Sequence, residues 1–238
     1  AHYVENNSNI DKEARKRGTS VYFPGFVIPM LPEILSNNLC SLRPDEDKFT
    51  VTAEIIIGKD GKIKSYKFYN ALISSSARLT YTQVDDFLHN KKSVTDKNVI
   101  KNINNLFSLY KILKKSREKR HAVNFDTQEF SFLISKNNEI TGIKNNIRLE
   151  SQKLIEECMI AANVASSLFI KKNKSNSLYR VHDEPTLEKI EDASISLKNL
   201  GYSLNKTKII CTEEINKIIE LSKKKLDDHL VTSIILRA

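Results

Sequence analysis

The sequence predicts an α/β chain of the α+β-like kind, in which a mixed β-sheet packs with long helices around one continuous core. Runs of β-branched and aromatic residues at 50–57 and 62–73 are joined by Gly58-Lys-Asp-Gly61, which is a strong hairpin signal. Two long stretches, 99–119 and 148–172, carry apolar residues at helical spacing. The chain has 238 residues, 40% of them hydrophobic, which is enough to bury a substantial core.

The N-terminal part combines a short charged helix with a proline-rich run. Residues 10–16 predict the helix, which stops near Gly18. The run 20–44 holds four of the five prolines, and Pro32 is well placed for the first turn of a short helix through Leu35. Proline fixes its own φ and biases the preceding residue towards extended geometry. Because the run is also apolar, we interpret it as a rigid, irregular loop that presents or covers something.

The remaining elements alternate between helices and strands. The two long helices have apolar stripes at Ile103, Leu106, Phe107, Tyr110 and Leu113, and at Leu154, Ile155, Cys158, Met159, Ala162, Ala165 and Phe169. The shorter predicted elements are a helix at 80–88 capped by Thr80 or Thr82, a hairpin of 130–135 with 139–144, a strand at 178–182, and helices near 186–200 and 213–225.

Composition limits the classes of protein. The net charge is +9, from 38 Lys plus Arg against 29 Asp plus Glu, which is compatible with nucleic acid. Lysine supplies 29 of those cations, and such a bias can also reflect genome composition, so charge alone does not establish RNA binding. No run approaches the roughly 18 apolar residues that span a bilayer, and no membrane partner is expected. Three widely spaced cysteines form no disulfide or zinc pattern, which predicts a reducing, cytoplasmic compartment.

Sequence patterns for catalysis are sparse. The five histidines show no ligand or triad spacing, and there is no Gly-x-Ser-x-Gly and no phosphate-binding glycine loop. Asp45-Glu-Asp47 and Asp85-Asp86 are the acidic clusters that could be tested as Mg²⁺ sites. We interpret the first as a solvated turn and the second as the polar face of a helix.

Tyr22 is a candidate for binding single-stranded nucleic acid. It lies on the stiff proline-rich run, close in sequence to the cations Lys12, Arg15, Lys16 and Arg17. A base stacked on such a ring is worth about 1–3 kcal/mol, while cations neutralise phosphates. The alternative is that Tyr22 is one more core aromatic, which the pattern alone favours.

Four blocks, taken together, resemble the ribonuclease R / ribonuclease II (RNB) family of exoribonucleases. They are residues 20–44, Arg78-Leu-Thr-Tyr-Thr-Gln-Val84, Lys153-Leu-Ile-Glu-Glu-Cys-Met-Ile-Ala-Ala-Asn163 and Tyr179-Arg-Val-His-Asp-Glu-Pro185, in the family's order. The last block favours the ribonuclease R branch. The resemblance implies that the parent is a processive 3′→5′ exoribonuclease that hydrolyses single-stranded RNA to nucleoside 5′-monophosphates.

The resemblance also implies roles for residues. Tyr22 would stack on an RNA base, and Phe125 would form a second aromatic wall around the 3′-terminal bases. Glu156 would accept a hydrogen bond from a ribose hydroxyl near the terminal nucleotide, and Tyr81 would border the RNA channel. Arg17 is a candidate RNA-binding residue on other grounds, as one of the cations beside Tyr22 in the sequence. Without the resemblance, Phe125 is a core strand residue, Glu156 belongs to a solvated helix face, and Tyr81 is a partly buried helix residue.

We expect residues 1–238 to be a fragment of a single RNB catalytic domain, lacking its N-terminal metal-binding part and its C-terminal part. In this family a cluster of aspartates holds Mg²⁺, and an arginine-bearing block follows further along. Neither is found in this sequence. Mg²⁺ is therefore expected in the intact parent and not on the fragment, which should be inactive. A fragment also exposes apolar surface, so we expect possible dimerisation, or partial disorder near residues 1–20 and after Lys225.

Other readings remain open at this point. A non-catalytic RNA-binding or scaffold protein of RNB-like fold would share the aromatic residues without the metal. A basic protein-interaction domain would share the charge. A DNA-binding protein is the third reading, but no helix-turn-helix or zinc pattern supports it.

Overall fold

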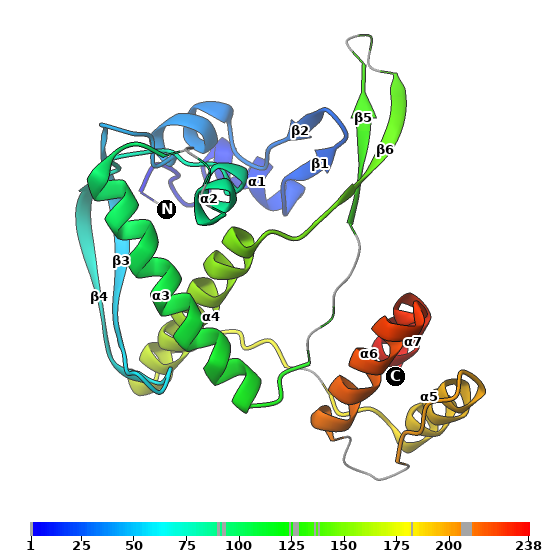
Figure 1. Cartoon of the computed structure of the whole chain (residues 1–238). Coiled ribbons are helices and arrows are strands. Elements are labelled where there is room, and N and C mark those ends of the chain that lie inside the picture. The colour runs from blue at the N-terminus through cyan, green and yellow to red at the C-terminus, as the bar shows by residue number, and fades with distance from the viewer. Residues whose placement is uncertain are drawn as a thin grey trace. The chain divides into compact units, whose positions relative to one another are not determined.

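The computed structural model describes residues 2–89, 91, 94–123, 125, 129–135, 137, 139–181, 183–205 and 211–238. The elements are α1 (Asn9–Arg17), β1 (Val21–Phe23), β2 (Phe26–Ile28), the π-helix η1 (Ile34–Leu39), β3 (Asp47–Ile57), β4 (Ile63–Ser74), α2 (Tyr81–Leu88), α3 (Lys97–Lys119), β5 (Glu129–Ile134), β6 (Ile140–Asn146), α4 (Glu150–Lys172), α5 (Leu187–Asn199), α6 (Thr212–Lys225) and α7 (Asp228–Arg237) (Figure 1).

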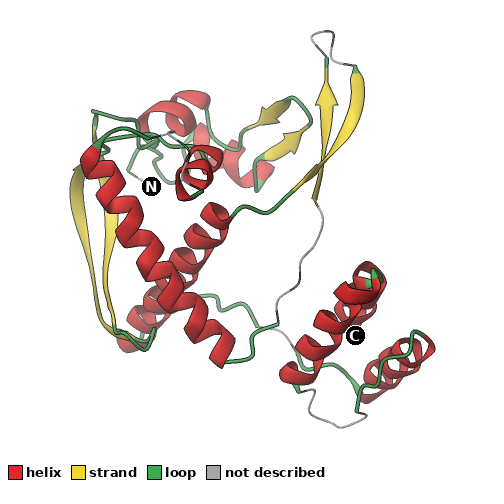
Figure 2. Ribbon diagram, viewed as in Figure 1, coloured by secondary structure: helices red, strands yellow, loops and turns green. Residues whose placement is uncertain are grey.

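The predicted combination of strands with long helices is confirmed, but the strands pair differently. In the described residues they form three two-stranded sheets, β1–β2, β3–β4 and β5–β6, in place of one mixed sheet (Figure 2). The registers of β1–β2 and β5–β6 are antiparallel. Each sheet joins strands that are consecutive in the chain, so local turns determine the pairing.

The chain divides into two compact units, which differs from the single continuous core that we expected. The first unit contains Ala1–Ile56, Ile63–Ser108 and Gln128–Ala165, and the second contains Ile57–Lys62, Leu109–Thr127 and Ser166–Ala238. The boundary crosses three elements, because α3, α4 and the β3–β4 hairpin each contribute to both units.

The core of the second unit lies between α5, α6 and α7. Its buried members are Ala193, Leu197, Tyr202, Leu204, Ile215, Ile218, Ile219 and Val231. The Ser194 hydroxyl donates to the Leu204 carbonyl at 3.1 Å, so this buried polar group is satisfied. α7 was not predicted, and the expected disorder after Lys225 is wrong, because Val231 of α7 is completely buried in this core.

Two further predictions require correction. No strand forms at 178–181, where Leu178 is fully exposed, and His182 lies outside the described residues. The proline-rich run is less irregular than expected, because Val21–Phe23 and Phe26–Ile28 pair as a hairpin. The helix after Pro32 is η1, which begins at Ile34 and extends past Leu35.

The long helices follow their predicted stripes in part. Ile103, Tyr110 and Leu113 of α3 are buried, whereas Leu106 is exposed. On α4 the buried residues are Ser151, Leu154, Glu157, Ala161 and Ala165, while Met159 is exposed. The buried face of α4 therefore differs from the predicted stripe and includes Ser151, Glu157 and Ala161, which the stripe did not contain.

Candidate nucleic-acid interface

Tyr22 lies in the β1–β2 hairpin, which displays its aromatic side chains. Tyr22 pairs with Val27 and Phe23 with Phe26, and the rings of that second pair stack at 4.9 Å between centroids with 12° between planes. Pro24 and Gly25 make the turn, in which Gly25 has φ +87° as position i+2 of a type II turn requires. The Tyr22 residue is 79% exposed, so the core alternative for this ring does not apply.

Arg17 fixes the base of this hairpin to α1. Its Nη1 donates to the Pro29 carbonyl at 2.7 Å, and its Nε donates to Glu13 Oε1 at 2.8 Å. The hydrogen bond from Arg17 lowers the pKa of Glu13, which keeps this ion pair charged. The Ser20 hydroxyl accepts a hydrogen bond from the Met30 N–H at 2.9 Å, which joins the two residues that flank the hairpin. Arg17 thus holds the two ends of the segment that carries Tyr22.

A cavity of about 290 Å³ lies between α1 and the segment that follows β2. Its lining residues are Asn9, Ile10, Glu13, Arg17, Pro29, Met30, Leu31 and Pro32. The cavity therefore lies next to the Arg17 contacts.

Tyr81 begins α2, which is positioned by a capping box and by α4. The Thr80 hydroxyl accepts from the Gln83 N–H at 3.2 Å, and Gln83 Oε1 accepts from the Thr80 N–H at 2.8 Å. The Ser151 hydroxyl of α4 donates to the Tyr81 carbonyl at 2.8 Å. The backbone of Tyr81 is therefore fixed, while its side chain is about half exposed.

The Tyr81 ring borders a cavity of about 420 Å³ in the first unit. The cavity is lined by Leu79, Thr80, Tyr81, Val84, Ile103, Leu106, Ser151, Leu154 and Ile155. Most of these side chains are apolar, so the cavity suits an apolar group or the face of a ring better than a phosphate.

Glu156 of α4 forms an ion pair with Arg148, just before the helix begins. Its side chain keeps about a third of its surface exposed, whereas its neighbour Glu157 is buried. The two adjacent glutamates therefore face different environments. The Glu156 carboxylate has lone pairs on two oxygens, so it can accept from Arg148 and from a second donor at once.

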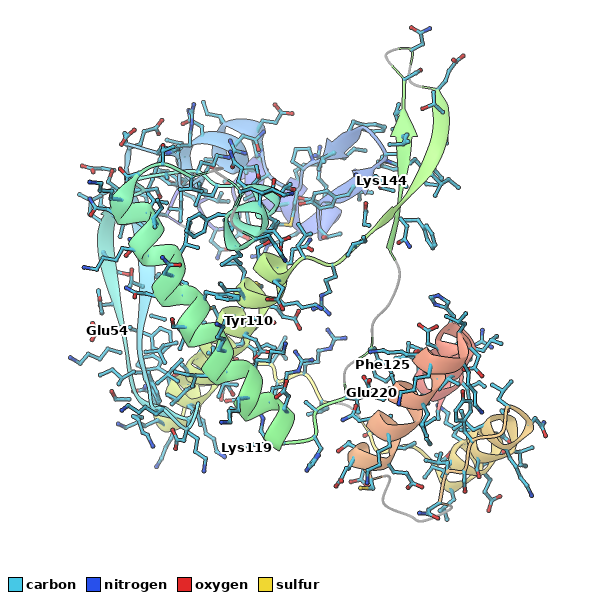
Figure 3. All side chains as sticks on the ribbon, viewed as in Figure 1. Glu54, Tyr110, Lys119, Phe125, Lys144 and Glu220 are labelled. Carbon is cyan, nitrogen blue, oxygen red and sulfur yellow. The ribbon has the colours of Figure 1, made fainter. Side chains whose placement is uncertain are left out.

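Phe125 belongs to the second unit, whereas Tyr22, Arg17, Tyr81 and Glu156 belong to the first. It is partly buried and packs against the core of α5, α6 and α7 (Figure 3). The preceding segment is held by Asn216 Nδ2 of α6, which donates to the carbonyls of His121 and Ala122 at 3.3 Å. Asn124 and Asp126 lie outside the described residues.

Sequence reasoning missed two features of the interface. The stacked pair Phe23 and Phe26 was hidden in a run interpreted as irregular, although Pro24-Gly25 between two apolar triplets is a turn signal. Arg148 was missed as the partner of Glu156, and no helical spacing could have shown it, because Arg148 precedes the helix.

Three of the five carboxylates that could be tested for Mg²⁺ have hydrogen-bond or ion-pair partners. Asp85 accepts from the Glu150 N–H at 3.1 Å and lies 3.4 Å from His89 Nδ1, and Asp86 pairs with Lys91 at 2.6 Å. Near Asp45 and Asp47, Glu46 pairs with Lys48 at 2.7 Å. Across the described residues no three His, Cys, Asp or Glu side chains gather as metal ligands, so these residues do not fit a magnesium site. Nor does any described helix have the length and apolar character to cross a membrane.

The arrangement of strands and long helices is the fold of a known family, because the family model named RNB domain matches residues 1–238. The chain belongs to the RNB domain family. It is 38% identical to ribonuclease R of Escherichia coli (strain K12) over 240 residues, which cover all of this chain and 30% of that protein. Ribonuclease R of Mycoplasmopsis pulmonis is 39% identical over 238 residues, covering all of this chain and 33% of the relative. The chain thus spans about a third of the curated relatives it matches.

Solved structures agree with this assignment. The apo form of Mycoplasma genitalium RNase R matches all of this chain and 37% of its own with a TM-score of 0.93 and 31% identity. The same enzyme in complex with double-stranded RNA matches with a TM-score of 0.94 and 31% identity, over all of this chain and 43% of that one. The yeast pseudonuclease Ssd1 shares the fold, with a TM-score of 0.69 at 17% identity over 99% of this chain and 28% of its own. The predicted family and fold class are confirmed.

Proposed function

We propose that this chain is the RNA-gripping part of a processive 3′→5′ exoribonuclease that hydrolyses single-stranded RNA to nucleoside 5′-monophosphates. The observation that carries the proposal is the exposed Tyr22 ring on a hairpin fixed by Arg17, in a chain that aligns from end to end with ribonuclease R. An exposed, immobilised ring provides a stacking platform for an unpaired base. Solved structures of Mycoplasma genitalium RNase R in complex with ribose-methylated single-stranded RNA and with double-stranded RNA support RNA as the ligand.

The other site residues take their places in this proposal. Tyr81 borders the RNA channel above an apolar cavity. Glu156 accepts a hydrogen bond from a ribose hydroxyl beside its ion pair with Arg148, because an ionised carboxylate is an acceptor group. Phe125 offers the exposed part of its ring to a base while the rest packs on the core. Arg17 acts on RNA mainly by holding the Tyr22 hairpin, because its guanidinium is engaged with Glu13 and Pro29.

Nucleases of this family generally require a divalent metal ion, and we propose Mg²⁺ for the intact parent, acting in the cytoplasm. We propose that residues 1–238 form one part of a single RNB catalytic domain.

Phe49 and Val51 of β3 are 77% and 78% exposed, so self-association of the chain through such apolar faces stays a prediction. A non-catalytic RNA-binding protein of the same fold is the second candidate, and an acidic cluster in the parent's sequence would decide against it.

The proposal is tested by measuring the affinity of the chain for a fluorescently labelled single-stranded RNA. Tyr22→Ala should weaken binding by about 1–3 kcal/mol, which is about 5- to 150-fold in Kd, because one stacked base is lost. Tyr22→Phe keeps the ring and should bind nearly as the wild type does. Tyr69→Ala is the control, since Tyr69 is a half-exposed tyrosine of another hairpin in the same unit. Equal affinities for Tyr22→Ala and Tyr69→Ala would overturn the proposal.

A further inference from the structure

The turn between β3 and β4 packs tightly against α3, within the second unit. Gly61 has φ +75°, and a Cβ at this position would lie 2.4 Å from Ser116 Cβ and 3.1 Å from the Ile112 carbonyl oxygen. Real Cβ atoms do not approach so closely, so a glycine is what allows the turn to touch the helix. This contact places the turn that carries Lys59 and Lys62 beside α3.

Lys119, the last residue of α3, and Arg120, which follows it in the turn, are the cations next to this contact. Successive residues of an α-helix are rotated by about 100°, so Lys119 lies about 60° to one side of Ser116. Together with the two lysines of the turn they form a group that we call the basic turn patch: Lys59, Lys62, Lys119 and Arg120. All four are exposed.

The basic turn patch differs from the arginines of α1 in its ion pairing. Arg15 and Arg17 of α1 are paired with Asp11 and Glu13. Among the described residues, no member of the basic turn patch takes part in an ion pair. The segments 58–62 and 116–120 contain five cations against two carboxylates, so the local charge is strongly positive.

We propose that the basic turn patch binds the sugar–phosphate backbone of single-stranded RNA, as a contact separate from base stacking on Tyr22. The segments 58–62 and 116–120 contain no aromatic residue, so the patch cannot stack on bases. Lysine binds phosphate as a point charge, and arginine can add two parallel hydrogen bonds. The contact would therefore be independent of RNA sequence and would release counterions. The proposal rests on the proposed function, because it takes the same RNA as its ligand.

The salt dependence of binding separates the two contacts. Each phosphate neutralised on a single strand contributes about −0.7 to the slope of log K against log salt. In the quadruple variant Lys59→Gln, Lys62→Gln, Lys119→Gln and Arg120→Gln, the slope should become shallower by about 3, and affinity at low salt should fall at least tenfold. Tyr22→Ala should lower affinity and leave the slope unchanged, since stacking releases no counterions.

A control variant with the same change in charge is available. Lys97→Gln, Lys101→Gln, Lys189→Gln and Lys198→Gln replace four exposed lysines on the first turns of α3 and on α5. Both quadruple variants should have the melting temperature of the wild type, measured by circular dichroism, because all eight side chains are exposed. If RNA binds at the basic turn patch, the control variant should keep most of the wild-type slope of log K against log salt.

Each outcome of the experiment decides a different claim. Equal slopes and affinities for the two quadruple variants, with Tyr22→Ala still impaired, would overturn the basic turn patch alone. A wild-type chain that does not bind single-stranded RNA would overturn the proposed function and this inference together. If the patch variant lost binding to polyglutamate or to anionic phosphatidylserine vesicles but kept RNA affinity, the assignment to RNA would be wrong.

Discussion

Tyr22 and Tyr202 are tyrosines in opposite environments, one exposed and one buried. Tyr22 is 79% exposed on a hairpin, whereas Tyr202 is 5% exposed and donates its hydroxyl to Asp227 Oδ1 at 2.6 Å. The Lys225 ammonium lies 4.6 Å from the centre of the Tyr202 ring. One tyrosine is therefore free to meet a ligand, and the other joins the α5–α6 connection to the turn before α7.

Tyr202 makes the stability of the second unit depend on pH in the alkaline range. Burial, and then the hydrogen bond to Asp227, raise the pKa of Tyr202 to about 12 from an ordinary value of 10.0. Because the folded state holds this proton more tightly than the unfolded state, the stabilisation is complete below pH 10 and is lost as the pH rises towards 12. Tyr202→Phe has no such proton to lose.

Urea unfolding of both proteins across this range checks the prediction. The wild type should be more stable than Tyr202→Phe at pH 8, and the difference should shrink between pH 10 and pH 12. Comparing the two proteins cancels the lysine titration that both undergo there. A difference that stayed constant up to pH 12 would contradict this role of the Tyr202 proton.

Among the predicted site residues, neither the exposure of Tyr22 nor the partners of the charged side chains followed from residue pattern. The pattern alone favoured a core position for Tyr22, whereas the family resemblance favoured the exposed position that the structure shows. The ion pair of Glu156 with Arg148 and the use of Arg17 to hold the Pro29 carbonyl depend on how separate segments meet. Residue types and spacing do not carry that information.

Helices and hairpins with local signals were predicted well. α2 begins where Thr80 and Gln83 form their capping box, and Gly18 ends α1 at φ +70°. The strand predicted at 178–182 failed because strands need a partner, and its described residues have none. β1 and β2 were missed because proline content was weighed above the Pro24-Gly25 turn.

Gly61 tests the packing of the β3–β4 turn on α3. Gly61→Ala should destabilise the chain by about 1–3 kcal/mol in urea unfolding, because it combines a left-handed backbone with a collision at Ser116. Gly18→Ala is the matched control, since Gly18 also has positive φ but nothing lies within 4 Å of the added carbon. It should lose less stability than Gly61→Ala. Equal losses would show that the contact with Ser116 does not constrain the turn.

The chain as a whole should bind RNA without cutting it. We predict that purified chain shows no Mg²⁺-dependent hydrolysis of labelled single-stranded RNA, because no three His, Cys, Asp or Glu side chains gather as metal ligands in the described residues. Gel electrophoresis of the RNA with Mg²⁺, and with EDTA as the control, provides the measurement. Progressive shortening of the RNA that EDTA abolishes would contradict the prediction.

By itself, the sequence determined the family, the combination of strands with long helices, and the elements whose ends are marked by caps, glycines and turn residues. These signals are local, because hydrogen bonds to neighbouring backbone groups and φ restrictions act over a few residues. The tertiary structure alone decided the division into two units, the buried face of α4, the burial of Val231 on α7, and the contact of the Gly61 turn with Ser116 of α3. Those features depend on which surfaces pack together, and packing joins residues whose separation in the chain carries no signal.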